Sequence, residues 1–347
     1  MPGGEKPDLV TGATGFVGSH LVRALRLRGR PVRALVRPGT DAGHLERLGV
    51  EVVPGDVTDA DGFSAAAHGA LRVFHVAGFV SFLREERVRL EAVNVGGVKN
   101  AVEAAREGGA SVLVVTSSVA AVGGGAKPGE VDETNPWPGD GMPGYAATKR
   151  AGEQAALAAN GKGLRVVAVN PSIVLGPDDP RPSAGGAYVL RSARGRIPAC
   201  VRMVQSFVDV RDVAEGHILA AEKGRGGERY ILSGASAVMP DFVERVRKEA
   251  GNPGRPVVLP RWVLPPLAIV AEWWAARRNQ PPVVTRDQAQ MAKRDGAFSA
   301  AKASRDLGWK PRPLAETIAD PKSDNSERNA RFLGAFVELQ GNIEAID

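Results

Sequence analysis

The 347-residue sequence is poor in cysteine, and its single thiol, Cys200, excludes an intrachain disulfide framework and suits a reducing compartment. Cys200 lies in an apolar segment after a proline, so we expect a buried, inert thiol rather than a nucleophile. No apolar run reaches the ~18 residues that a membrane-spanning helix needs, and no apolar segment of signal-peptide type follows residues 1–8. These absences predict a cytoplasmic protein without a membrane span.

Clustered charge is absent as well. The formal net charge is +6 and the pI is near 9.6, but the arginines are scattered and form no basic block. We therefore expect a solvated basic surface, a modest preference for anionic ligands, no nucleic-acid partner and no metal site. With 43% hydrophobic and 24% charged residues, the composition is that of a globular protein with a buried core.

Short β-branched segments alternate with longer amphipathic segments over the first half of the chain, which is typical of a parallel sheet covered by helices. We expect strands at residues 9–11, 32–36, 51–53, 72–76, 111–116 and 164–169. Helices are expected to begin near Gly15, Asp41, Asp59, Arg84 and Pro143. The predicted fold class is α/β, a Rossmann-type doubly wound parallel sheet.

After Asn170, segments rich in proline and glycine, such as residues 176–186, interrupt this alternation. Residues 207–209 and 229–232 are predicted to be strands that return to the sheet. We therefore expect a first domain of residues 1–174, to which residues 206–238 return. Residues 175–205 and 239–320 would form a smaller, discontinuous lobe, and residues 321–347 a tail of unknown role.

The segment TGATGFVG, residues 11–18, follows the first predicted strand and opens the first predicted helix. Gly12, Gly15 and Gly18 suit a turn with positive φ, a close approach of backbone to a pyrophosphate, and tight packing of helix on strand. The pyrophosphate would lie on the N-terminal N–H groups of that helix. Glycine spacing alone also fits a plain strand-to-helix turn, so the dinucleotide site depends on the residues that follow.

Arg37 ends the second predicted strand, where a carboxylate would bind the ribose 2′-hydroxyl of NAD and an arginine can pair with the 2′-phosphate of NADP. Arg37 therefore favours NADP, and Arg33 is a weaker candidate on the same strand. After the third strand, Asp56 could accept a hydrogen bond from the adenine amino group. We expect Asp59 to be the N-cap of the next helix.

Ser118, Tyr145 and Lys149 are the candidate catalytic residues. Tyr145 and Lys149 are four residues apart, so on a helix they lie on one face, and a nearby ammonium is expected to lower the phenol pKa. Such pairs are common on protein surfaces, but this helix follows the fifth strand, whose end carries Ser118. Ligands of open α/β sheets bind at the carboxyl ends of the strands, where a hydroxyl can donate to a carbonyl oxygen.

These motifs, together with HVAG (residues 75–78), AVNVGGVKN, VTSSVAAVG, NPSIVLGP and FVDVRDVA, resemble the extended branch of the short-chain dehydrogenase/reductase superfamily. Within it the sequence is most similar to the dihydroflavonol 4-reductase-like group. That group also includes bacterial carbonyl reductases, 3β-hydroxysteroid dehydrogenase-like proteins and hopanoid-associated "sugar epimerases". The similarity runs from about Leu9 to Leu314 and includes the segment FSAAKASRDLGWKPR.

The resemblance implies an NADP(H)-binding domain, a substrate-binding lobe and the following roles. Gly12, Gly15 and Gly18 would bind the pyrophosphate with backbone donors from Phe16 and Val17, Arg37 the 2′-phosphate, Asp56 and Val57 the adenine, and Ala77 and Gly78 the adenosine ribose region. Asn94 would support the nearby loop ends, Pro171, Ser172 and Ile173 would set the nicotinamide face, and Thr14 and Thr116 complete the expected cofactor contacts. Ser118 takes the place of the catalytic serine, and Lys149 would also anchor the nicotinamide ribose.

Three functions remain open. The first is reduction of a hydrophobic ketone or aldehyde by NADPH. The second is NAD-dependent epimerisation of a nucleotide sugar, whose pyrophosphate could bind the basic residues Arg181, Arg191, Arg194, Arg196 and Arg202. The third is a non-catalytic NADP-binding sensor, which has no need for Ser118, Tyr145 and Lys149. Val119 and Ala120 follow Ser118 where dehydratases of this superfamily carry an Asp-Glu pair, which argues against sugar dehydration.

A tryptophan-rich segment, residues 262–274, has three interpretations: a core helix, an apolar pocket wall, or an interfacial helix that lies on a membrane. The second favours a hydrophobic substrate, and the third leaves peripheral membrane contact open. The resemblance further implies a homodimer that pairs through the helices beginning near Arg84 and Pro143.

Overall fold

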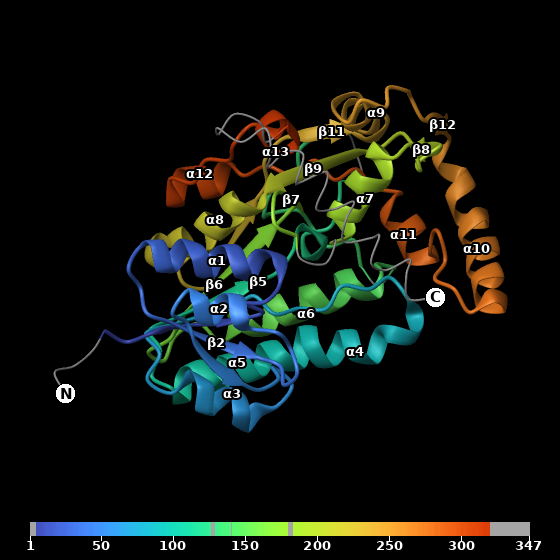
Figure 1. The fold of residues 1–347 in the computed structure, drawn as a ribbon. Coiled ribbons are helices and arrows are strands. Elements are labelled where there is room, and N and C mark those ends of the chain that lie inside the picture. The colour runs from blue at the N-terminus through green and yellow to red at the C-terminus, as the bar shows by residue number, and fades with distance from the viewer. Residues whose placement is uncertain (1–4, 126–128, 140, 180–182, 320–347) are drawn as a thin grey trace.

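The computed structural model describes residues 5–125, 129–139, 141–179 and 183–319, so the tail at residues 321–347 and Arg181 lie outside the described residues. A seven-stranded parallel sheet in the order β10-β6-β5-β4-β1-β2-β3 forms its centre (Figure 1). The strands are β1 Asp8–Thr11, β2 Val32–Val36, β3 Glu51–Pro54, β4 Arg72–His75, β5 Val112–Thr116, β6 Arg165–Pro171 and β10 Arg229–Leu232. The predicted α/β fold with a Rossmann-type sheet is confirmed.

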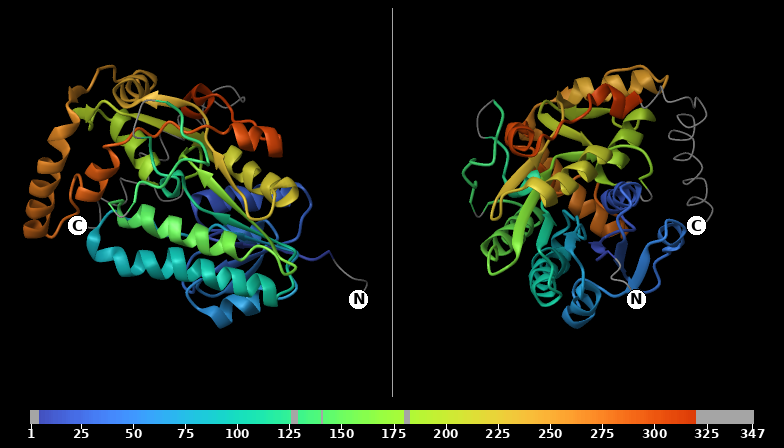
Figure 2. Two further views of the ribbon diagram at one scale, coloured as in Figure 1. Left: turned by 180° about the vertical axis from the view of Figure 1, so that it is seen from behind. Right: turned by 90° about the vertical axis from the view of Figure 1, so that its left-hand side faces the viewer.

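The central strands are apolar on both faces, which is why they occupy the middle of the molecule. Val10, Phe74 and Val114 point into one core, whereas their strand neighbours Leu9 and Leu113 point into the other. The first core is covered by α1 (Phe16–Leu27), α2 (Gly43–Arg47), α8 (Val210–Lys223) and α12 (Ala301–Leu307). The second is covered by α3 (Ala60–Ala67), α5 (Gly97–Glu107) and α6 (Gly144–Ala158), on the opposite side of the sheet (Figures 1 and 2).

The predicted helix starts agree with the structure to within about two residues. Asp59 is the N-cap residue of α3 as expected, although its side chain makes no capping hydrogen bond. The remaining helices and helical turns are η1 Arg84–Glu86, α4 Arg87–Glu91, η2 Ala92–Gly96, η3 Val119–Ala121, α7 Ala184–Ala193, α9 Met239–Glu249, η4 Arg261–Val263, α10 Leu264–Arg278, α11 Arg286–Met291 and α13 Leu314–Ala319.

Two smaller sheets lie above the carboxyl end of the main sheet. One has the order β11-β9-β7, with β7 Ile173–Leu175, β9 Val204–Asp209 and β11 Ser236–Val238; the other pairs β8 (Ala199–Val201) with β12 (Val257–Leu259). The prediction that residues 207–209 return to the main sheet is therefore wrong. β10 occupies the edge of β6, with Arg229 opposite Ala168, and β9 pairs with β7 and β11 instead.

Two further expectations need correction. Cys200 lies in β8 and is only half-buried, and desolvation raises the pKa of its thiol. The interpretation of residues 262–274 as a core helix is wrong, because within α10 only Ala268 and Ala275 are buried. Across the described ranges no helix has the length and apolar character needed to cross a membrane.

Candidate active site

The glycine turn after β1 is shaped by two positions that admit no side chain. Gly12 has φ +69°, and a Cβ there would lie 2.8 Å from the backbone nitrogen of Ala77. A Cβ on Gly18 would lie 2.0 Å from the carbonyl oxygen of Gly12. The turn closes with a 2.9 Å hydrogen bond from the Gly15 N–H to the same oxygen. Glycine at these positions thus lets the turn pack closely against the backbone of Ala77 and the start of α1.

The N-terminus of α1 is free to bind an anion. Its N-cap residue is Gly15, no side chain caps it, and no acidic residue lies in the first turn, which begins with Phe16 and Val17. The first N–H groups of a helix lack intrahelical partners and carry a partial positive charge. This arrangement, with the half-buried Thr14 beside it, fits the pyrophosphate of a dinucleotide.

Arg37 is exposed beyond the end of β2, and its guanidinium makes no hydrogen bond or ion pair with any described residue. Arg33, the weaker candidate, is committed elsewhere: it donates to the carbonyl oxygens of Ala66 and His68 at 2.9 and 2.8 Å. Of these two arginines, Arg37 is therefore the one that is free to meet a 2′-phosphate.

Asp56 lies within the electrostatic reach of Arg37 and precedes Val57, which is buried. Partial burial opposes its ionisation, but hydrogen bonds from the backbone and hydroxyl of Thr58, with the charges of Arg37 and Arg89, hold the pKa of Asp56 below its ordinary value. Both bonds from Thr58, at 2.9 and 2.7 Å, end on Oδ1. Oδ2 remains able to accept from an adenine amino group.

Gly78, Asn94 and Lys149 meet at the end of β4. A Cβ on Gly78 would lie 3.0 Å from Lys149 Nζ and 3.5 Å from Asn94 Oδ1. Asn94, in η2, accepts from the Phe79 N–H and donates to the Phe79 carbonyl, both at 2.9 Å, and so fixes the loop that follows Gly78. The missing side chain at Gly78 leaves the ammonium accessible to a ribose hydroxyl.

Lys149 lies on α6 and is 8% exposed. Its Nζ donates to the carbonyl oxygen of Thr116, at the end of β5, over 2.9 Å. Burial lowers the pKa of Lys149 to about 8, and the nearby Glu153 carboxylate acts in the opposite direction.

Tyr145, on α6, and Ser118, after the end of β5, lie close enough for the Ser118 hydroxyl to act on the pKa of the Tyr145 phenol. The Ser118 Oγ also accepts from the Ala120 N–H at 3.2 Å. Burial raises the pKa of the Tyr145 phenol above its ordinary value, and the neighbouring Ser118 hydroxyl opposes this shift. The prediction that Lys149 lowers this pKa does not hold here, because desolvation dominates and the ammonium is bonded to Thr116. The phenol therefore keeps its proton at neutral pH.

The expected nicotinamide residues follow the end of β6. The Ser172 N–H donates to the Leu232 carbonyl at 3.0 Å, whereas the Ser172 hydroxyl is buried and has no hydrogen-bond partner among the described residues. An unpaired buried hydroxyl has a free-energy cost unless a ligand or water satisfies it. Ser172, between Pro171 and Ile173, thus offers a polar contact suited to a carboxamide.

Two groups of residues that sequence reasoning missed support Ser118 and Lys149. Asn170 Nδ2 donates to the Ser118 carbonyl at 3.0 Å and also to the Glu153 carboxylate, which pairs with Arg229 at 3.0 Å. On the other side, the Thr116 hydroxyl lies 2.7 Å from His217 Nε2.

His217 Nδ1 lies 2.8 Å from the Val213 carbonyl, so Nδ1 carries the proton and Nε2 accepts from Thr116. Burial lowers the pKa of His217 to about 4, which keeps the ring neutral. In the sequence, the spacing of four residues between Lys149 and Glu153 is the one feature that could have indicated the group of Asn170, Glu153 and Arg229. No sequence feature indicated His217.

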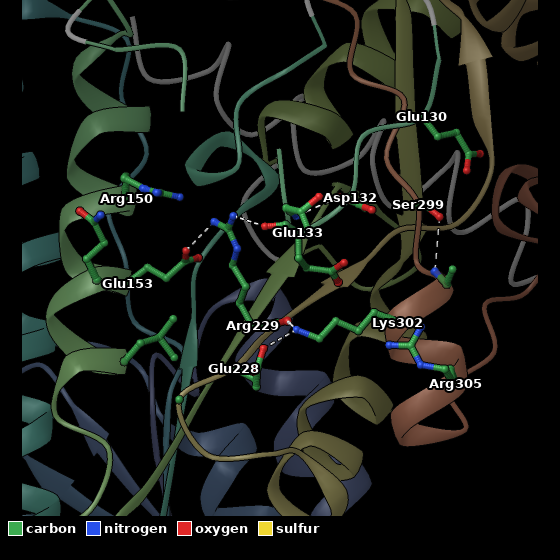
Figure 3. A pocket seen from close by; sticks show the side chains of 15 residues that line it. Glu130, Asp132, Glu133, Arg150, Glu153, Glu228, Arg229, Ser299, Lys302 and Arg305 are labelled. Carbon is green, nitrogen blue, oxygen red and sulfur yellow. Dashed lines mark hydrogen bonds and ion pairs between the residues drawn. The ribbon is translucent and has the colours of Figure 1, made fainter. Parts of the chain in front are cut away.

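A cavity of about 700 Å³ lies on another side of α6, between that helix, β10 and α12 (Figure 3). Its lining is charged, but the charges pair with each other, as in Glu153 with Arg229 and Glu228 with Lys302. Ser118, Tyr145 and Lys149 do not line it. The cavity is therefore separate from the candidate active site.

The doubly wound sheet and its open glycine turn define a dinucleotide-binding α/β protein. Residues 9–233 match the NAD dependent epimerase/dehydratase family, and the chain belongs to that family. It is an oxidoreductase of a family whose members bind a nicotinamide cofactor, and the resemblance to extended short-chain dehydrogenases/reductases is confirmed.

Three similar proteins span nearly the whole chain. A Synechocystis sp. protein with a provisional dihydroflavonol 4-reductase name is 35% identical over 90% of this chain and 92% of its own. Sterol demethylase protein B of Methylococcus capsulatus is 32% identical over 90% and 96%. The crystal structure of gox2253 superposes with a TM-score of 0.81 at 38% identity and covers 91% of this chain and 96% of that one.

Proposed function

We propose that the protein is an NADP(H)-dependent carbonyl reductase that acts on hydrophobic ketones or aldehydes. The observation that carries this proposal is the Ser118 hydroxyl next to the Tyr145 phenol, with the buried ammonium of Lys149 one helical turn further along α6. A sensor would have no chemical reason to keep these three groups together at the carboxyl end of β5. The provisional name of the Synechocystis relative points to the same reaction class.

The described residues fit a bound NADP(H). The α1 N-terminus would hold its pyrophosphate, Arg37 its 2′-phosphate, Asp56 and Val57 its adenine, and Lys149 the nicotinamide ribose. When bound, NADPH supplies the hydride that reduces the carbonyl carbon. Asn94 would keep the Gly78 loop open for the ribose by fixing Phe79.

Ser118 and Tyr145 act on the substrate oxygen. The Ser118 hydroxyl would donate to the carbonyl oxygen and orient it, and the Tyr145 phenol would transfer its proton to the oxygen as negative charge develops there. Burial favours this direction, because it raises the phenol pKa and keeps the proton on Tyr145. Asn170 would fix the backbone of Ser118 during the reaction.

The groups beside this pair favour an apolar substrate. The Phe82 ring lies edge-on to Tyr145, with 5.8 Å between ring centroids, and Val119 follows Ser118 and packs into a small apolar cluster. An epimerase would need cations for a sugar pyrophosphate. Arg191, Arg196 and Arg202 are exposed, and no observation directs them towards Ser118.

The test compares two sets of substrates under identical conditions. Purified protein is expected to oxidise added NADPH with hydrophobic ketones or aldehydes, including steroid- or flavonoid-like ring compounds, and to leave UDP-hexoses unchanged. Co-purified NAD together with interconversion of a UDP-hexose would instead establish the epimerase. Absence of both activities, with intact NADPH binding, would favour the sensor.

A homodimer that pairs through α4, α5 and α6 is part of the proposal. Val88 on α4 is 82% exposed, and a second copy would cover it. Light scattering of the wild type and of Val88→Glu tests this arrangement, since the dimer mass should be lost in the variant.

A further inference from the structure

Helix α10 is packed the opposite way to an ordinary surface helix. Amphipathic helices turn their large apolar residues towards the core. Here the two buried positions are alanines, Ala268 and Ala275, whereas Trp273 and Trp274 are 52% and 50% exposed. Trp262, in the turn before the helix, is 72% exposed.

The exposed apolar residues lie together. Leu267, Val270 and Trp274 are three or four positions apart along the helix, and Ile269 and Trp273 flank them, so they share one side of α10. We call Leu267, Ile269, Val270, Trp273 and Trp274 the tryptophan face. Figures 1 and 2 show α10 at the periphery of the molecule, next to α11. A patch of this kind marks a surface that binds something.

The charge of this face is positive. The Arg277 guanidinium lies 3.5 Å from the centre of the Trp273 ring, and that of Arg278 lies 4.4 Å from the Trp274 ring. Neither arginine forms an ion pair with another described residue. The helix has a single acidic residue, Glu272, whose side chain is 21% exposed and paired with Arg286 at 2.5 Å. The tryptophan face therefore offers cations with no competing free carboxylate.

We propose that the tryptophan face binds the headgroup region of an anionic phospholipid bilayer, with α10 parallel to the membrane plane. Tryptophan rings have an apolar body and one N–H donor, which suits the boundary between headgroups and acyl chains. Arg277 and Arg278 can pair with lipid phosphates while they remain stacked on these rings. A protein partner would have to place carboxylates opposite both arginines, whereas an anionic bilayer carries phosphates over its whole surface.

Vesicle co-sedimentation of the full chain tests the proposal. The protein is expected to bind vesicles of phosphatidylcholine mixed with phosphatidylglycerol, to bind phosphatidylcholine alone much more weakly, and to dissociate at high salt. Tryptophan fluorescence should shift to shorter wavelength on binding. Arg277→Glu/Arg278→Glu should weaken binding by roughly thirtyfold or more, because each basic residue near an anionic surface contributes appreciably. Trp273→Ser/Trp274→Ser should also remove most of the binding.

Two control variants test whether vesicle binding depends on the tryptophan face. Arg47→Glu/Arg225→Glu makes the same change of charge at exposed positions on α2 and after α8, and should keep most of the binding. Leu27→Ser removes an exposed apolar side chain, 88% accessible, at the end of α1 and should leave binding unchanged. All variants should melt near the wild type, since the replaced side chains are exposed.

The proposal is overturned if the wild type fails to bind anionic vesicles, if the control pair loses as much binding as Arg277→Glu/Arg278→Glu, or if neutral vesicles bind equally well. It is also overturned if the wild type self-associates without lipid and the tryptophan variants are monomeric. In that case a second copy of the chain covers this face.

Discussion

The ammonium of Lys149 and the carbonyl oxygen of Thr116 are joined by a 2.9 Å hydrogen bond that ties the middle of α6 to the end of β5. This bond holds the helix that carries Tyr145 against the strand that precedes Ser118. Because the ammonium is bonded to Thr116, the pKa of the Tyr145 phenol is set by burial and by the Ser118 hydroxyl. In the proposed reductase, Lys149 would therefore link the cofactor side of the site to the substrate side.

The first prediction concerns the proton donor. Tyr145→Phe should lower kcat by about 10²- to 10⁴-fold, the usual loss when a positioned acid is removed. Binding of NADPH should change little, because the phenol faces Ser118 and not the glycine turn. Steady-state kinetics and fluorescence titration measure the two quantities. Full turnover by the variant would show that another group donates the proton.

The second prediction concerns the choice of nucleotide. Arg37→Asp should weaken NADPH binding by about 1.5–3 kcal/mol and affect NADH far less, since a charged hydrogen bond to the 2′-phosphate is replaced by repulsion. Titration of both nucleotides gives the two affinities. Arg37→Lys serves as the conservative control and should recover part of the preference. Equal losses for the two nucleotides would remove Arg37 from the site.

The third prediction concerns pH. The pKa of Lys149 is lowered to about 8, so the side chain is charged below that pH and becomes neutral as the pH rises through it. The affinity of the free enzyme for NADPH should therefore fall above pH ~8 with the loss of one proton. Tyr145 titrates above its ordinary pKa of 10.0 and lies outside this window. In Lys149→Met, titration calorimetry across this range should show weaker binding with no transition near pH 8.

Much of the fold was predictable because the strands are apolar on both faces and the helices are separated from them by glycine turns. Periodicity identifies a strand but not its partner, which is why the sequence predicts residues 207–209 in the main sheet although β9 pairs with β7 and β11. The same limit applies to α10: an apolar helix was evident, but whether its large residues face inward depends on what surrounds it. Ser118, Tyr145 and Lys149 could be proposed from their spacing. The support from Asn170 and His217, and the burial that raises the Tyr145 pKa, arise from contacts between distant segments.

The fourth prediction concerns the ion pair behind the active site. Glu153 is 2% exposed and pairs with Arg229, whose side chain is 13% exposed. Glu153→Ala would leave that guanidinium without its carboxylate and should lower the free energy of unfolding by about 3–5 kcal/mol. Glu228→Ala is the matched control in the same cavity: its carboxylate is 48% exposed and pairs with Lys302, so the loss should stay within about 1 kcal/mol (Figure 3). Urea denaturation measures both, and similar losses would contradict the role of burial.

The last prediction contrasts two tryptophans. Trp309 is 1% exposed, lies in the core between the sheet and α8, and donates from Nε1 to the Asp212 carbonyl at 2.8 Å. Trp309→Ala should therefore cost about 3–5 kcal/mol of stability, through lost packing contacts and the lost hydrogen bond to Asp212. Trp262 is 72% exposed, and Trp262→Ala should change the free energy of unfolding by no more than about 0.5 kcal/mol. Denaturant unfolding in the absence of lipid measures both free-energy changes. A large loss for Trp262→Ala would mean that this tryptophan is already packed in the protein alone, and a small one leaves it available for a partner.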